Sequence, residues 1–323
     1  MSSKKTIKAL CTRPLPTSLI AFFHENAPNL QLHCHPKDAS VPVEDLLNWV
    51  KKESPEALIV TLTEDCNADF IFGLPESVRI LSTMAVGTDN IDSHACAQRD
   101  IRVAHTPHVL TEATADLTWA LILAAGRRLQ EGHVLCQNEK FQGWSPTLLL
   151  GKEFYKSRLG IVGMGRIGKA VAKRSWGFGM NVSYFNRHPV VQDEEIELLN
   201  PNYCATIEEL CEKSDVISIH CPLNENSFHL FNQTVLKKCK KDAVLVNVAR
   251  GPIIDENALV EVLKDGYFTG VGLDVFENEP QMDSRLFDFS RVVLSPHIGS
   301  ATYETRMKMM KMAVQAVLGE KCI

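Results

Sequence analysis

The chain alternates between short, continuous apolar runs and longer segments in which apolar residues recur at helical spacing. In the first hundred residues the apolar runs predict strands, and one intervening segment predicts a helix over 43–50. The predicted strands of this first part are 7–11, 57–62, 80–84 and 102–104. After residue 157 the pattern returns, with strands at 159–162, 182–185, 216–220, 243–248, 270–275 and 292–295. Strands that alternate with helices are typical of doubly wound parallel sheets in α/β proteins.

A long helix is predicted between the two series. It begins at Thr111 with acidic residues and runs to residue 129, with arginines near its end, as the helix dipole favours. The following segment, 130–157, is predicted to be irregular. A last helix over 303–318 is predicted to pack back on the first series. The sequence therefore predicts two Rossmann-like domains, one discontinuous (1–104 and 299–323) and one continuous (105–298).

Composition narrows the class of protein. With 323 residues and 45% apolar residues, the chain can bury two substantial cores. A net charge of −5 gives no reason to expect nucleic acid as a partner. The basic N-terminus lacks the apolar stretch of a signal peptide, and the apolar stretch at 119–125 is too short for a bilayer, so we expect no membrane partner and a cytoplasmic location. The ten cysteines include no CxxC pair, so we expect free thiols and no metal site.

The strand at 159–162 is followed by three glycines with the spacing GxGxxG. Gly163 permits the tight turn, Gly165 lets the backbone approach a pyrophosphate, and Gly168 lets the next helix lie close to the sheet. The pyrophosphate would lie at the N-terminus of that helix. The motif alone occurs by chance in many chains, but its strand–turn–helix–strand context predicts a dinucleotide site.

The end of the next strand indicates which dinucleotide is bound. About 20 residues after the motif, where a carboxylate would accept a hydrogen bond from a ribose hydroxyl, the chain carries Asn186 and Arg187. Arg187 could pair with a 2′-phosphate, which a carboxylate would repel. The sequence therefore favours NADP, while NAD stays open because Arg187 could equally be a solvated surface residue.

Three polar residues, Arg250, Glu279 and His297, each come shortly after one of the later strands. In an open α/β sheet, ligands bind at the carboxyl ends of the strands. Each residue alone is more often structural than catalytic. Together they supply a guanidinium fork for a carboxylate, a proton donor and an anion that orients the donor. Reduction of a 2-oxo acid needs this set.

These motifs give the chain a resemblance to a known family over nearly its whole length. The chain resembles the D-isomer-specific 2-hydroxyacid dehydrogenases, and within them the glyoxylate/hydroxypyruvate reductases. The ordered segments that carry the resemblance are 82–92, 106–111, 163–168, 247–251, 272–280 and 296–300. The resemblance implies a flavodoxin-like substrate-binding domain and an NAD(P)-binding Rossmann domain.

The resemblance also implies roles for individual residues. Arg250 would hold the substrate carboxylate and carbonyl, His297 would be the acid/base, and Glu279 would pair with His297. The backbone amides of Val86 and Gly87 would hold the other side of the carboxylate. The other residues expected near substrate or cofactor are Asp274, Arg166, Ile167, His188, Cys221, Pro222, Val248, Ala249 and Gly299.

Trp144 resembles a tryptophan that these reductases insert into the substrate pocket of the neighbouring subunit, although an interface or core tryptophan is an equal alternative. A homodimer through the helix at 111–128 and the following loop is implied. Two departures stand out: the chain ends at Ile323, where relatives usually continue with a short tail, and Val190 replaces a basic residue of close relatives.

The expected activity is NAD(P)H-dependent reduction of glyoxylate to glycolate or of hydroxypyruvate to D-glycerate. Glu279 argues against the formate dehydrogenases of the superfamily, which carry glutamine there. Two alternatives stay open. One is another D-2-hydroxyacid dehydrogenase, such as the phosphoglycerate type, and the other is a binding protein like the NAD(H)-sensing co-repressors, which keep the Arg/Glu/His set.

Overall fold

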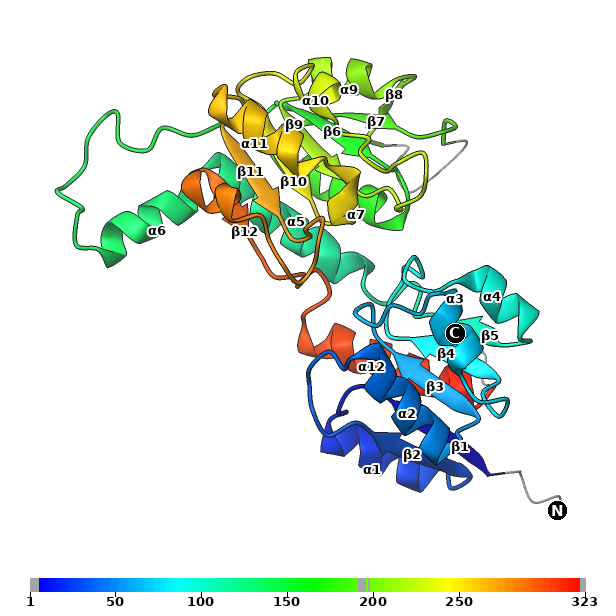
Figure 1. Ribbon diagram of the computed structural model, residues 1–323. Helices are drawn as coiled ribbons and strands as arrows, with labels where there is room; N and C mark the ends of the chain where they lie inside the picture. Colours follow the sequence, from blue (N-terminus) through cyan, green and yellow to red (C-terminus); the bar gives the residue numbers. More distant parts are fainter. Residues whose placement is uncertain (1–5, 191–195, 197, 320–323) are drawn as a thin grey trace. The chain divides into compact units, whose positions relative to one another are not determined.

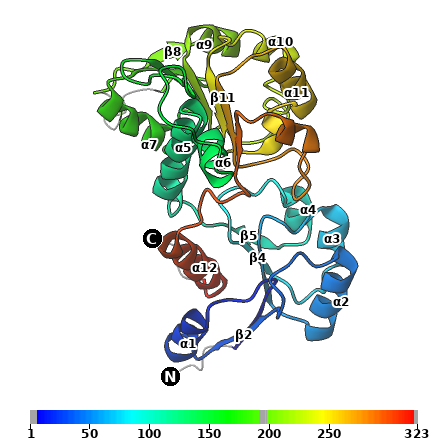
Figure 2. The same ribbon diagram turned by 90° about the vertical axis from the view of Figure 1, so that its left-hand side faces the viewer.

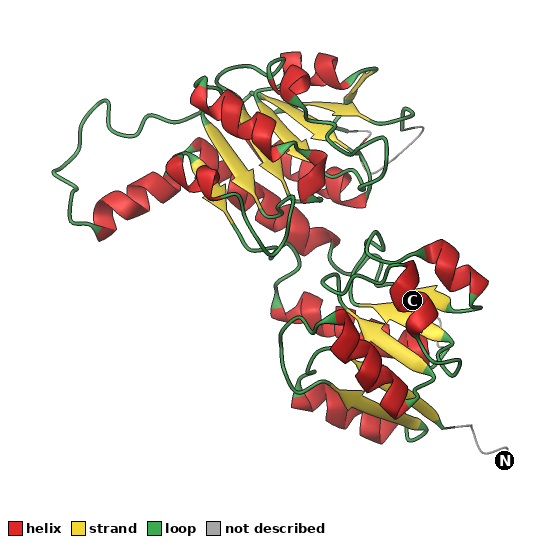
Figure 3. Cartoon of the chain, in the orientation of Figure 1, coloured by secondary structure: helices red, strands yellow, loops and turns green. Residues whose placement is uncertain are grey.

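The computed structural model describes residues 6–190, 196 and 198–319. Its contacts divide the chain into two units, the first comprising Met1–Leu110 with Ala301–Ile323 and the second comprising Thr111–Ser300. Each unit is a parallel sheet with helices on both faces (Figure 3). The α/β class with two doubly wound sheets is as predicted.

The first unit contains a five-stranded sheet in the order β2-β1-β3-β4-β5, which is the flavodoxin-like order. Its strands are β1 (Ile7–Cys11), β2 (Leu30–Cys34), β3 (Ala57–Val60), β4 (Ile80–Thr83) and β5 (Arg102–Ala104). Its helices are α1 (Thr17–Asn26), α2 (Val43–Glu53), α3 (Ala68–Gly73), α4 (Ser93–Gln98) and α12 (Tyr303–Val317). One face packs on α1 and α12 and the other on α2, α3 and α4 (Figure 2).

The C-terminal helix α12 belongs to this first unit. The Ser82 hydroxyl donates a hydrogen bond to the Ala313 carbonyl at 2.9 Å, and the Arg102 guanidinium donates to the Ala316 carbonyl at 2.5 Å. Apolar residues of α12 join the core cluster of α1 and β1. The first unit therefore contains two separate stretches of the chain, 1–110 and 301–323.

The second unit contains seven parallel strands in the order β12-β11-β10-β9-β6-β7-β8, a Rossmann arrangement centred on β6. Its strands are β6 (Arg158–Val162), β7 (Asn181–Phe185), β8 (Asn202–Cys204), β9 (Val216–Ile219), β10 (Val244–Asn247), β11 (Gly270–Leu273) and β12 (Val292–Leu294). Its α-helices are α5 (Thr111–Gly126), α6 (Leu129–Gln137), α7 (Arg166–Ser175), α9 (Ile207–Lys213), α10 (Gln233–Leu236) and α11 (Glu256–Lys264). Short 3-10 helices cover Trp176–Phe178, Gly251–Ile253 and Ser284–Asp288.

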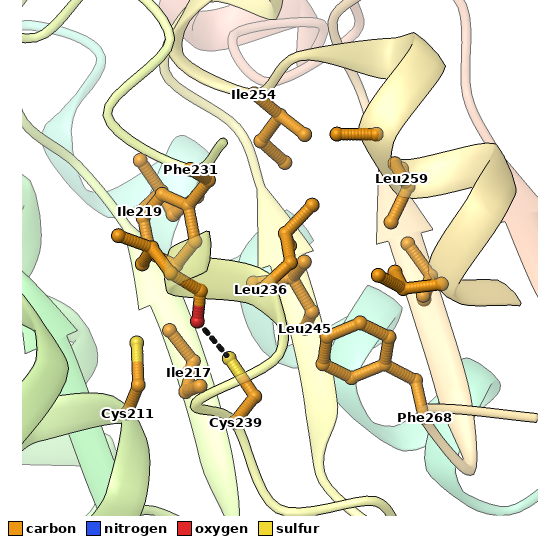
Figure 4. Close-up of a cluster of buried hydrophobic side chains, with 14 of the residues drawn as sticks. Cys211, Ile217, Ile219, Phe231, Leu236, Cys239, Leu245, Ile254, Leu259 and Phe268 are labelled. Atoms are coloured by element: carbon orange, nitrogen blue, oxygen red, sulfur yellow. Dashed lines mark hydrogen bonds between the residues drawn. The ribbon is translucent and has the colours of Figure 1, made fainter. Parts of the chain in front are cut away.

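The central strands of this unit are buried on both faces, because successive side chains of a strand point to opposite sides. Val216 of β9 packs in the cluster of α5 and α7, while Ile217 and Ile219 pack in the cluster of α10 and α11. Figure 4 shows the latter cluster, in which the Cys239 thiol donates to the Val235 carbonyl at 3.7 Å. Two filled cores hold β6, β9, β10 and β11 rigidly, and these strands carry the predicted site.

Two predictions for residues 111–157 are wrong in one respect each: the helix that begins at Thr111 is shorter than predicted, and the segment after it contains a second helix. Helix α5 ends at Gly126, and a second helix, α6, begins at Leu129. A Cβ at Gly126 would lie 2.3 Å from the Phe154 ring, and Arg128 has a φ of 54°, so the chain turns there. Arg128 then pairs with Glu131 in the first turn of α6 at 2.7 Å. Since no residue of α6 is buried in the described chain, the burial pattern that reveals other helices is missing here.

Helix α6 and the loop after it extend away from the sheet of the second unit (Figure 1).

Within the part of the chain that the structure describes, no helix combines the length and the apolar character needed to cross a bilayer.

Candidate active site

The glycine motif forms the turn between β6 and α7. Gly163 has a φ of +96°, and a Cβ there would lie 2.6 Å from the Cys221 nitrogen, which real structures do not tolerate. A Cβ at Gly168 would lie 2.2 Å from the Gly163 carbonyl oxygen. A Cβ at Gly165, by contrast, would meet no described atom within 4 Å. The first and third glycines are thus required by packing, and the second leaves the backbone open to a ligand.

This arrangement fits a dinucleotide. The open backbone at Gly165 leads directly into Arg166 and Ile167 at the N-terminus of α7, where the positive end of the helix dipole favours a phosphate. Cys221 and Pro222 follow β9 and lie beside the turn at Gly163. Residues of the glycine turn would therefore hold a pyrophosphate, with no side chain of Gly165 in its way.

The residues after β7 have different surroundings: one contacts the glycine turn, and the next two are exposed. The Asn186 Oδ1 accepts a hydrogen bond from the Met164 amide at 2.8 Å, so this side chain holds the glycine turn itself. Arg187 and His188 are exposed at the end of the strand. The predicted contact of Arg187 with a 2′-phosphate stays a prediction.

Arg250 lies in a turn after β10 that its neighbours hold. The buried Asn247 side chain donates to the Arg250 carbonyl at 2.8 Å and accepts from the Ala249 amide at 3.0 Å. The Arg250 guanidinium donates to the Ala249 carbonyl at 2.8 Å. A Cβ at Gly251 would lie 1.9 Å from the carbonyl of Phe276, so this turn packs directly on the segment after β11.

His297 and Glu279 form a hydrogen-bonded pair. The His297 Nδ1 lies 2.8 Å from the Glu279 Oε2, and the other carboxylate oxygen accepts from the Phe276 amide at 3.0 Å. Burial opposes the charge of Glu279. The hydrogen bond and charge of His297, the Phe276 amide and the charge of Arg250 outweigh burial, so the pKa of Glu279 lies below its usual value. The structure therefore brings the three predicted residues together at the carboxyl ends of β10, β11 and β12.

Asp274 holds the turn that carries His297. It is 1% exposed, and its carboxylate accepts hydrogen bonds from the Ser295 hydroxyl at 2.6 Å and from the Ile298 and Gly299 amides at 2.8 Å each. Its carbonyl accepts from the His297 amide at 2.8 Å. Burial raises the pKa of Asp274 above its usual value, because its effect exceeds the opposite effect of these hydrogen bonds. Through these bonds Asp274 maintains His297 at a φ of 52°, a conformation unfavourable for a residue with a side chain.

The remaining predicted residues lie elsewhere. Val86 and Gly87 follow β4 in the first unit and are half-buried, and the His105 ring donates to the Val86 carbonyl at 3.1 Å. Trp144 lies in the loop after α6 and is 85% exposed. Val248 is buried and Ala249 half-buried, beside Arg250.

Sequence reasoning assigned no role to two residues that shape this site. Asn247 holds the turn of Arg250, and Ser295 donates to Asp274. Both are small polar residues at the ends of apolar strands, the same signal that pointed to Arg250 and His297. Their position could have identified them, but only the fold shows which groups their side chains bind.

Comparison with known proteins shows the family to which the chain belongs. The model of the D-isomer specific 2-hydroxyacid dehydrogenase NAD binding domain matches residues 119–299. A glyoxylate reductase of Thermococcus gammatolerans is 37% identical over 97% of this chain and 92% of its own length. One from Aeropyrum pernix is 44% identical over 85% of this chain and 82% of its own length. A solved glyoxylate reductase of Paecilomyes thermophila has a TM-score of 0.84 and 32% identity, covering 96% of this chain and 94% of that chain.

The fold and site therefore define a nicotinamide-dependent oxidoreductase with a Rossmann cofactor domain. The chain belongs to the D-isomer specific 2-hydroxyacid dehydrogenase family and is an NAD(P)-dependent enzyme of that family.

We predict that Gly163→Ala weakens the binding of both NADH and NADPH by roughly tenfold or more. A strained φ costs on the order of 1–3 kcal/mol, and the Cβ would also displace the Cys221 backbone. Quenching of protein fluorescence on titration with each dinucleotide measures the effect. Gly177→Ala is the matched control, because a Cβ there would meet no described atom within 4 Å. Equal affinity of Gly163→Ala and wild type would contradict the prediction.

Proposed function

We propose that this enzyme is a glyoxylate reductase that also reduces hydroxypyruvate, forming glycolate and D-glycerate. The observation that carries the proposal is the 2.8 Å hydrogen bond between His297 and Glu279, with the charge of Arg250 acting on the same carboxylate. Curated relatives of 36–44% identity are named glyoxylate reductases, which supports glyoxylate as a substrate.

A bound reduced nicotinamide supplies the hydride for carbon 2 of the oxo acid. His297 donates a proton to the carbonyl oxygen from Nε2, since its Nδ1 is engaged with Glu279. Glu279 remains charged and stabilises the imidazolium, because its pKa is lowered by that pairing. Arg250 binds the substrate carboxylate through its planar fork and stabilises the negative charge that develops on the carbonyl oxygen.

We also propose that the backbone amides of Val86 and Gly87, in the first unit, bind the substrate carboxylate, since backbone N–H groups are suitable donors to a carboxylate. The residues proposed to lie near the cofactor are Val248, Ala249, Asp274 and Gly299, together with Cys221 and Pro222 after β9.

The test is a spectrophotometric panel of glyoxylate, hydroxypyruvate, pyruvate and phosphohydroxypyruvate, each with NADPH and NADH. We expect the highest kcat/KM with glyoxylate or hydroxypyruvate. A preference for phosphohydroxypyruvate would replace the proposal with a phosphoglycerate-type dehydrogenase. Poor turnover of all four would favour the co-repressor-like alternative.

Two variants in the same assay test the assigned roles. We expect His297→Gln to lower kcat by about 10²–10⁴-fold, the usual contribution of general acid catalysis, with little change in KM. Arg250→Lys keeps the charge but loses the planar fork, so it should raise KM for the oxo acid as well as lower kcat. Wild-type turnover in either variant would refute its assignment.

We further propose NADPH as the preferred cofactor, since the exposed Arg187 follows β7 where a carboxylate would select NADH. Arg187→Asp is expected to shift the ratio of kcat/KM values from NADPH towards NADH by at least tenfold. Lys156→Asp makes the same charge change in an exposed residue before the amino end of β6 and should leave the ratio unchanged. An unaltered ratio in Arg187→Asp would show that Arg187 does not contact the phosphate.

We also propose a homodimer in which a second copy covers the extended arm formed by α6 and residues 138–150. The arm exposes large apolar side chains that a monomer would leave in water. They include Phe141 (54% exposed), Trp144 (85%) and Leu150 (64%). Trp144 would then close the pocket of the neighbouring subunit.

Light scattering should therefore report twice the chain mass of 36.0 kDa. Trp144→Ala is expected to remain dimeric but to accept larger acids such as 2-oxobutyrate with a raised kcat/KM. A monomeric wild type would refute the dimer. An unchanged substrate range in the variant would refute only the role of Trp144.

A further inference from the structure

The second unit contains another histidine–carboxylate pair, outside the proposed proton transfer. His229, which precedes α10, places its Nε2 at 2.8 Å from the Glu277 Oε1. The two side chains are 30% and 20% exposed, so water screens the pair only in part. Glu277 lies two residues from Glu279, on the same segment after β11.

Glu277 is also bound to the N-terminus of α11. Its second carboxylate oxygen accepts from the Glu256 amide at 3.2 Å, and the Glu256 carboxylate accepts from the Glu277 amide at 2.8 Å. This reciprocal pairing joins the first residue of α11 to the segment after β11. It also places two carboxylates close together, and burial together with the charges of Glu277 and Asp283 raises the pKa of Glu256.

His229 supplies a donor to this group of acids and connects it to the turn of Arg250. Its amide donates to the Pro252 carbonyl at 2.8 Å. Gly251 in that turn lies against the Phe276 carbonyl, and the Phe276 amide donates to Glu279. The contacts around His229 and Glu277 therefore reach both the turn of Arg250 and the carboxylate that pairs with His297.

We propose that Glu277 and His229 are positioning residues that hold the segment 276–279, so that the Glu279 carboxylate stays on the Nδ1 of His297. The inference rests on the proposed acid/base role of His297. Loss of Glu277 frees this segment from α11 and from His229 at once. Glu279 then spends less time on His297, and the imidazolium loses part of its stabilising charge.

A purely structural role would lower stability and leave the hydrogen bond between His297 and Glu279 intact. A positioning role weakens that hydrogen bond in the folded protein. The charged groups that face His297 are Glu279 and Asp274, with Arg250 acting on Glu279. Those that face the Glu277 group are His229, Glu256, Asp283 and Arg285. Changing Glu277 alone removes none of these groups.

The experiment uses the full-length protein, with NMR of the histidine ring N–H protons and steady-state kinetics in parallel. His297→Gln identifies the Nδ1–H signal of His297. For Glu277→Ala we expect this signal to move upfield, because a proton that is hydrogen-bonded to a carboxylate resonates at low field and the bond to Glu279 is weakened. We expect kcat for glyoxylate to fall about tenfold with KM within about twofold, as for a change felt mainly in the transition state.

Two further variants keep the test informative if Glu277→Ala folds poorly. Glu277→Gln retains an oxygen for the Glu256 amide and should show a smaller shift, and His229→Gln should resemble it. Glu261→Gln is the matched control, because this glutamate on α11 forms its described side-chain hydrogen bond with Lys264 and not with Glu277 or His229, and it should behave as wild type.

The outcomes separate the two proposals. If Glu279→Gln moves the His297 Nδ1–H signal and lowers kcat but Glu277→Ala, Glu277→Gln and His229→Gln change neither, the positioning role is overturned and the proposed function stands. If the wild type reduces none of the four oxo acids, the proposed function fails, while the NMR signal of His297 still tests the positioning role.

Discussion

The buried carboxylate of Asp274 is the constraint on which the active site depends. A charged group at 1% exposure would be strongly unfavourable without partners, and here three hydrogen bonds from the Ser295 hydroxyl and two backbone amides satisfy it. Because all three donors belong to the turn after β12, satisfying the carboxylate fixes that turn. His297 is consequently held at a positive φ, and the cost of this conformation is offset by bonds outside its own side chain.

Three acidic residues, Asp274, Glu277 and Glu279, lie within six positions of the chain. Each has different hydrogen-bond partners and therefore a different role. Asp274 binds backbone amides of the next turn, Glu277 binds the start of α11 and His229, and Glu279 binds the imidazole of His297. Burial opposes the charge of Asp274 and of Glu279 alike, but the imidazole and Arg250 reverse the balance for Glu279 alone. The environment of each carboxylate, set by the fold, assigns it to structure or to chemistry.

The glycine turn and the positions of Arg250, Glu279 and His297 after strands could be predicted from the sequence, because glycine spacing and apolar runs reveal them. Gly168 packs on the Gly163 carbonyl within the same turn, and strand ends are readable from apolar runs. Helix α6 was missed because it buries no apolar face in the described chain. The reciprocal bonds of Glu256 and Glu277 could not be foreseen, since their partners lie 21 residues apart and meet only when β11 and α11 are in place.

The packing at Gly251 joins the turn of Arg250 to the segment that carries Glu279, the hydrogen-bond partner of His297. With a Cβ position only 1.9 Å from the Phe276 carbonyl, the turn of Arg250 cannot move without displacing the segment that ends in Glu279. The Asn247 side chain fixes the other side of the same turn. It donates a hydrogen bond to the Arg250 carbonyl and accepts one from the Ala249 amide. A site held in this way by backbone contact and buried amides keeps its charges at set distances, so little reorganisation is needed when charge develops on a substrate.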